Sequence, residues 1–104
     1  MTNLFTPPTE PLSAEFFETL ARAPHCRIER IVSHGQASPP DFWYDQTEAE
    51  WVAVLAGAAK IRFAEETVDL QPGDTLYIAS HRKHRVEWTT PDAATIWLAV
   101  FYSE

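Results

Sequence analysis

The sequence has one cysteine, Cys26, only three glycines and no long apolar run. A single cysteine excludes an intramolecular disulfide and a metal site built from several thiolates. No apolar stretch approaches the ~20 residues that a membrane-spanning helix needs. Basic residues are also few, because eight Lys and Arg stand against 15 Asp and Glu, and the net charge is −7. That balance argues against nucleic acids and membrane surfaces as partners.

The N-terminus predicts a cytoplasmic protein. Its first residues, MTNLFTPPTEPLS, have neither the basic region nor the apolar region of a secretory signal. Pro7, Pro8 and Pro11 disfavour helix and central strand, so we expect an extended arm over residues 1–12. A chain of 104 residues fits one domain, which we place at residues 13–104.

One short helix is expected over residues 13–23. Ser13 is a suitable N-cap, and Glu15 would lie in the first turn, where the helix dipole favours an acid. Apolar residues at helical spacing and a terminating proline complete the pattern: Phe16, Phe17, Leu20 and Pro24.

From Cys26 onward the hydrophobic pattern has a period of two, which predicts strands separated by turns, as in a sandwich or barrel. Two of these strands, 51–56 and 94–102, are apolar on both faces and need cover from the helix or from a second subunit. We therefore expect a homodimer. The expected strands are 27–34, 51–56, 60–64, 67–70, 75–79, 84–89 and 94–102, with Gly57-Ala58 as a candidate hairpin connection.

Two spaced patterns occur within these strands. In the first, Glu50 is followed by six residues and Gly57. The second runs at fixed spacing through Gly73, Ala79, His81, His84 and Trp88. In both patterns the chain resembles the cupin family of small jelly-roll barrels. The resemblance implies an all-β jelly-roll barrel over residues 26–102, with a pocket inside it.

The resemblance also implies a candidate metal site. Cupins typically hold one divalent ion with three His and one Glu, and here Glu50 and His84 keep their positions. The histidines of the first pattern are replaced by Tyr44 and Gln46, or by Trp43 and Asp45 in the alternative register. We predict Gln46, Glu50 and His84 as metal ligands. The additional candidates are Tyr44, Asp45 if the strand slips by one residue, His34 and His81.

The ligand types bear on which metal would bind. Oxygen-rich donors favour Mn²⁺, Mg²⁺ or Ca²⁺, whereas a second imidazole with Glu50 and His84 would suit Fe(II). We therefore expect Mn, Fe or Ni rather than Zn. In the alternative, no metal binds, and Glu50 and His84 are a buried carboxylate–imidazole pair that satisfies itself.

Aromatic residues are expected to line the interior pocket: Tyr44, Trp51, Tyr77 and Trp88. Arg82, Lys83 and Arg85 either pair with nearby acids or meet a small anionic molecule at the mouth. Three functions follow. The chain could be a metal-dependent oxygenase, isomerase or lyase, a non-catalytic module that binds or senses a small molecule, or a structural dimer domain with an incidental pocket.

Overall fold

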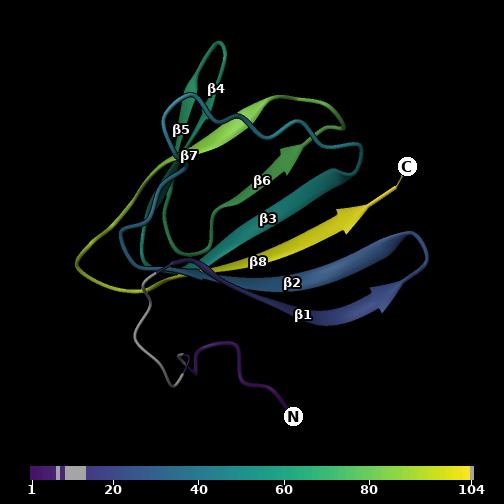
Figure 1. The fold of residues 1–104 in the computed structure, drawn as a ribbon. Helices are drawn as coiled ribbons and strands as arrows, with labels where there is room; N and C mark the ends of the chain where they lie inside the picture. Colours follow the sequence, from purple (N-terminus) through teal and green to yellow (C-terminus); the bar gives the residue numbers. More distant parts are fainter. Residues whose placement is uncertain (7, 9–13, 104) are drawn as a thin grey trace.

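The computed structural model describes residues 1–6, 8 and 14–103, and its strands form two antiparallel sheets (Figure 1). The five-stranded sheet has the order β1-β2-β8-β3-β6, and the three-stranded sheet has the order β5-β4-β7. The strands are β1 Phe16–Ala23, β2 Cys26–Ser33, β3 Ala49–Ala56, β4 Ala59–Phe63, β5 Thr67–Leu70, β6 Thr75–Ile78, β7 His84–Thr89 and β8 Thr95–Tyr102. The all-β class is confirmed. The predicted barrel is not closed, because no pairing among the described strands joins one sheet to the other.

The predicted helix over residues 13–23 is wrong, because Phe16–Ala23 is the edge strand β1. β1 pairs with β2 in antiparallel register, from Phe16 opposite Val32 to Ala23 opposite Cys26. Glu18 lies opposite Arg30, and their side chains form an ion pair at 3.0 Å. Phenylalanine and threonine also favour strands. Cross-strand pairing with β2 therefore outweighed the helical spacing of the apolar residues.

The N-terminal arm is described only at residues 1–6 and 8, so the N-cap predicted at Ser13 lies outside the described residues. Asn3 to Thr6 form a turn, in which the amide of Thr6 donates to the carbonyl of Asn3 at 3.1 Å. The guanidinium of Arg30, 5% exposed, donates to the carbonyls of Asn3, Leu4 and Thr6. The start of the chain is thereby anchored to β2 by a buried charge.

Gly57 connects the two sheets and does not close a hairpin. β3, which precedes it, pairs with β6 and β8, whereas β4, which follows it, pairs with β5 and β7. Gly57 has a φ of +85°, and a Cβ at this position would lie 2.6 Å from the Cα of Thr95. Only glycine fits a left-handed backbone so close to another strand.

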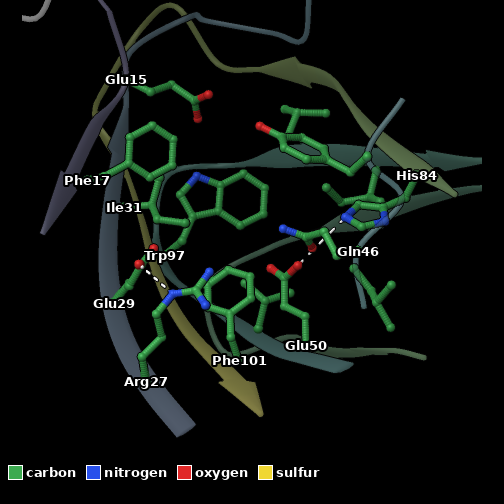
Figure 2. Close-up of a pocket in the computed structure, with 15 residues that line it drawn as sticks. Glu15, Phe17, Arg27, Glu29, Ile31, Gln46, Glu50, His84, Trp97 and Phe101 are labelled. Carbon is green, nitrogen blue, oxygen red and sulfur yellow. Dashed lines mark hydrogen bonds and ion pairs between the residues drawn. The ribbon is translucent and has the colours of Figure 1, made fainter. Parts of the chain in front are cut away.

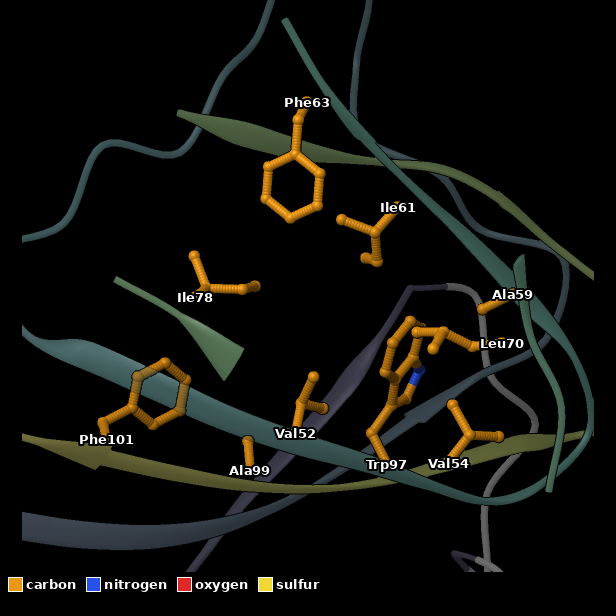
Figure 3. Close-up of a cluster of buried hydrophobic side chains, with 10 residues drawn as sticks. All are labelled: Val52, Val54, Ala59, Ile61, Phe63, Leu70, Ile78, Trp97, Ala99 and Phe101. Carbon is orange, nitrogen blue, oxygen red and sulfur yellow. The ribbon is translucent and has the colours of Figure 1, made fainter. Parts of the chain in front are cut away.

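The hydrophobic core lies between the sheets and receives side chains from both (Figure 3). Its buried members are Val52, Val54, Ala59, Ile61, Phe63, Leu70, Ile78, Trp97, Ala99 and Phe101. The predicted alternation along β4 holds, because Ala59, Ile61 and Phe63 are buried while Lys60 and Arg62 are exposed. Within the described residues there is no helix of the length and apolar character needed to cross a membrane.

Candidate small-molecule pocket

A cavity of about 250 Å³ lies between the sheets beside the core (Figure 2). Strands of both sheets supply its walls, together with the segment before β1 and the loop before β3. The walls consist mainly of aromatic and aliphatic side chains, with a few polar groups among them. The lining residues are Glu15, Phe17, Arg27, Glu29, Ile31, Tyr44, Gln46, Glu50, Val52, Ile61, Ile78, His84, Val86, Trp97 and Phe101.

Glu50 and His84 face each other in this cavity. Glu50 lies on β3 and His84 begins β7, so the pair spans the two sheets. The Oε1 atom of Glu50 is 3.7 Å from the Nε2 atom of His84, and the two side chains are 12% and 6% exposed. Figure 2 shows the carboxylate of Glu50 pointing toward the imidazole of His84, with Gln46 beside them. The separation is too long for a hydrogen bond.

The imidazole of His84 has a fixed orientation. Its Nδ1 lies 2.9 Å from the carbonyl of Arg82, and a carbonyl can only accept, so Nδ1 carries a proton. The ring stacks on that of Tyr44, with centroids 5.3 Å apart and an angle of 23° between the planes. The ring of Phe63 also contacts it, in a tilted arrangement. In the neutral ring, Nε2 therefore presents a lone pair to the cavity.

The loop before β3 brings Tyr44 and Gln46 to the pocket wall. The amide of Tyr44 donates to the carbonyl of His84 at 2.7 Å, and the amide of His84 donates back at 3.1 Å. The carbonyl of Gln46 accepts from the amide of His81 at 2.7 Å. This short ladder places two residues of the first sequence pattern beside His84.

The other ligand candidates lie outside the cavity. Asp45 lies between Tyr44 and Gln46 in the sequence but does not line the cavity. Its carboxylate is 2.8 Å from the Nδ1 of His81. Both side chains are well exposed, at 43% and 63%. His34 is exposed as well, and its Nε2 lies 3.0 Å from the carbonyl of Pro91. Among the described residues, no group of three or more His, Cys, Asp or Glu side chains could hold a metal ion.

Three of the four aromatic residues predicted as pocket walls lie on outer faces. Trp51, Tyr77 and Trp88 are 36%, 47% and 39% exposed, and only Tyr44 lines the cavity. Trp51 follows the inward Glu50 directly, and Tyr77 precedes the inward Ile78, so strand alternation turns both outward.

Trp88 is outside the pocket for a different reason. Lys60 lies opposite Trp88, but its neighbour Ile61 lies opposite Val86, so β7 contains one extra residue there. Such a bulge shifts the alternation of the strand. His84 and Val86 line the cavity, whereas Trp88 turns to solvent.

The sequence reasoning missed several polar residues of the cavity. Glu15 approaches it from the segment before β1 and accepts a hydrogen bond from the hydroxyl of Ser33 at 2.7 Å. Arg27 and Glu29 lie on the inward face of β2, paired at 2.9 Å. The alternation of β2 could have indicated this, because Arg27 and Glu29 share one face of the strand with the apolar Ile31, which also lines the cavity.

The charges around Arg27 are largely satisfied. Its guanidinium pairs with Glu29 and, at 2.5 Å, with Glu48, and it lies over the ring of Phe101 at 4.2 Å. The basic residues proposed from the sequence to meet an anion at the mouth do not line the cavity: Arg82, Lys83 and Arg85. Arg82 pairs with Glu65 and Glu66. Arg85 donates to the carbonyls of Ser38, Pro39 and Phe42.

Tyr44 reports on the electrostatics of the cavity. Burial raises the pKa of its hydroxyl, and the negative charges of Glu15 and Glu50 raise it further. Both carboxylates therefore act on the same wall of the pocket from different elements. The hydroxyl remains protonated at neutral pH and can donate a hydrogen bond.

The fold and this pocket define a class of protein. A family model described as a cupin domain matches residues 29–101, and the chain therefore belongs to the cupin family. This confirms the resemblance inferred from the two sequence patterns. No curated protein matches the chain.

Solved structures agree with this assignment. The crystal structure of "a putative mannose-6-phosphate isomerase" from Ralstonia eutropha JMP134 is similar, with a TM-score of 0.95 and 40% identity. The alignment covers 100% of this chain and 98% of that one. A cupin superfamily protein from Desulfitobacterium hafniense DCB-2 has a TM-score of 0.74 at 18% identity, with 94% of each chain covered. The structure named FeII HppE has a TM-score of 0.71 at 18% identity, covering 85% of this chain and 50% of that one.

Proposed function

We propose that the cavity between the sheets binds a small organic molecule and that this binding is the function of the chain. The observation that carries the proposal is the cavity of about 250 Å³, where apolar walls meet a few convergent polar groups. That combination is the usual form of a small-molecule site. Its volume is several times the roughly 30 Å³ that one water molecule occupies.

Unpaired polar groups on the walls also support a ligand. The carboxylate of Glu50 belongs to a residue that is 9% exposed, and no hydrogen bond to it is found among the described residues. A buried carboxylate without a donor costs free energy in a structural domain. A ligand or water molecule that donates to Glu50 would remove that cost.

Nuclear magnetic resonance tests the proposal with three probes of similar shape: benzyl alcohol, benzylamine and benzoate. The indole N–H of Trp97, assigned by comparison with Trp97→Phe, reports on the cavity because Trp97 lines it. We expect at least one probe to shift this signal. Ile31→Trp should abolish the shift by filling the cavity, whereas Ile28→Trp, on the opposite face of the same strand, should keep it. No shift with any probe would overturn the proposal.

A weakly held divalent metal is a second candidate, favoured by the facing Nε2 of His84 and carboxylate of Glu50. The amide of Gln46 would add a third donor. Two ionisable ligands and one amide fit a weak site and favour Mn, Fe or Ni over Zn. The metal would supply Lewis-acid polarisation for a reaction of the oxygenase, isomerase or lyase class. Of these classes, the name of the Ralstonia eutropha protein favours an isomerase.

Elemental analysis of protein purified without a histidine tag tests the metal. We expect less than one equivalent, with Mn, Fe or Ni exceeding Zn. Glu50→Gln and His84→Ala should each remove the metal, while Asp69→Asn, an exposed carboxylate outside the cavity, should not. Stoichiometric zinc, or unchanged metal in both pocket variants, would rule this candidate out.

A homodimer remains a prediction, and the outer face of the five-stranded sheet is the surface that would form it. Trp51 and Tyr77 lie opposite each other on neighbouring strands and are partly exposed there. Light scattering at several protein concentrations would measure the mass. Trp51→Lys should lower the mass to that of one chain if this face is the interface.

A further inference from the structure

We propose that the ligand of this cavity is an organic cation, a protonated amine attached to a small apolar body. The inference rests on the proposed function, since it names the ligand class of the same pocket. Its basis is the juxtaposition of carboxylates, unpaired acceptors and aromatic rings around one cavity. Three features of the cavity wall favour a cation.

The first feature is the charge of the walls. The acidic and basic lining residues are three glutamates, Glu15, Glu29 and Glu50, one arginine, Arg27, and His84. Arg27 is already paired with Glu29 and, outside the lining, with Glu48. Over residues 1–6, 8 and 14–103, neither Glu15 nor Glu50 has a Lys or Arg partner, and Glu50 faces the imidazole of His84. Such a site repels an anion and attracts a cation.

The second feature is the hydrogen-bonding character of the exposed atoms. Ionised carboxylates only accept hydrogen bonds, and Nε2 of neutral His84 also accepts, because its proton is on Nδ1. The His84 side chain is 6% exposed and its Nε2 has no hydrogen-bond donor within the described part of the chain. An ammonium group has three donors and no acceptor. It would complement both His84 and Glu50 at the same point.

The third feature is the aromatic enclosure. The rings of Phe17, Tyr44, Trp97 and Phe101 line the cavity. Aromatic faces attract cations as well as apolar groups, and the attraction strengthens when water is excluded. One face of Phe101 is already covered by the guanidinium of Arg27, at 4.2 Å from the ring centroid. The cavity thus combines surfaces for both parts of an aryl or alkyl amine.

The probe set distinguishes this inference from the proposed function. With a chelator present to exclude metal ions, benzylamine should bind about tenfold more tightly than benzyl alcohol, and benzoate should bind most weakly. Benzyl alcohol or benzoate binding as tightly as benzylamine would overturn the cation inference while keeping a small-molecule pocket. If none of the three probes shifts the Trp97 signal, both the cation inference and the proposed small-molecule function are overturned.

Charge-neutral variants identify the carboxylates responsible. Glu15→Gln keeps an oxygen that can accept from Ser33, so the wall should stay in place. We expect Glu15→Gln and Glu50→Gln each to weaken benzylamine binding by about fivefold, with benzyl alcohol affected less than about twofold. Asp69→Asn removes the same charge from an exposed position outside the cavity and should change neither affinity. Equal losses for both probes, or a loss in Asp69→Asn, would contradict the role of the pocket carboxylates.

Discussion

The indole Nε1 of Trp97 donates a hydrogen bond to the hydroxyl of Ser33 at 3.1 Å. Trp97 is 3% exposed and Ser33 is fully buried. The hydroxyl of Ser33 donates in turn to Glu15 at 2.7 Å. This chain of two hydrogen bonds connects a pocket wall on β8 to a carboxylate that precedes β1. Two buried residues, Trp97 and Ser33, therefore fix the position of the Glu15 carboxylate in the cavity wall.

Ser33→Ala should destabilise the protein by about 1–3 kcal/mol, because it leaves the buried indole N–H of Trp97 without an acceptor. Urea unfolding followed by tryptophan fluorescence would measure the change. Ser80→Ala is a matched control, since the hydroxyl of Ser80 donates to the carbonyl of Thr47 at an exposed site. The control should lose less than about 1 kcal/mol. Equal losses in the two variants would contradict the assigned role of Ser33.

His84 and Glu50 should respond unequally to substitution. His84→Ala removes the stacking on Tyr44, leaves the carbonyl of Arg82 without its donor and opens a cavity, so we expect a loss of about 3 kcal/mol. Glu50→Gln removes a carboxylate whose Oε1 is 3.7 Å from the Nε2 of His84, too far for a hydrogen bond. The free energy of unfolding should therefore fall by less than about 1 kcal/mol. Thermal and urea unfolding of both variants would check this. A large loss in Glu50→Gln would instead indicate a strong native pair.

Much of the strand pattern could be predicted from the sequence, because β4 alternates between buried and exposed residues and β3 and β8 are mainly apolar runs. Where the prediction failed, non-local pairing decided the outcome. Phe16, Phe17 and Leu20 have helical spacing, yet pairing with the edge of β2 makes this segment a strand. A bulge in β7 turns Trp88 outward, and the hydrophobic periodicity of the sequence does not predict where a bulge will occur. Glu15, predicted in the first turn of a helix, lines the pocket from the segment before β1.

The link between the sheets should be intolerant of a side chain at Gly57. Gly57→Ala would place a Cβ 2.6 Å from the Cα of Thr95 at a φ of +85°, and we expect a loss of more than about 2 kcal/mol. Gly73 has a similar φ of +93° but open space around it. Gly73→Ala should therefore cost only about 1 kcal/mol from backbone strain. Equal losses in these two variants would show that strain, and not the approach of Thr95, governs Gly57.

Tyr44 should make the protein lose stability at alkaline pH. Burial, with the charges of Glu15 and Glu50, raises the pKa of its hydroxyl above the ordinary value of 10.0. Between the unfolded and folded pKa values, the folded state then binds more protons than the unfolded state. The free energy of unfolding must fall as the pH rises above about 10, and this contribution is constant below that pH.

Tyr44→Phe removes the titrating group, so the free energy of unfolding should decline less steeply from about pH 9 to pH 11 than in the unmodified protein. Urea unfolding at several pH values would give both curves. Tyr102→Phe changes a tyrosine that does not line the cavity and keeps Tyr44, so it should retain the steeper decline. Identical slopes for Tyr44→Phe and the unmodified protein would mean that the carboxylates of the pocket do not act on Tyr44. The negative field proposed to select a cationic ligand would then lose its support at this wall.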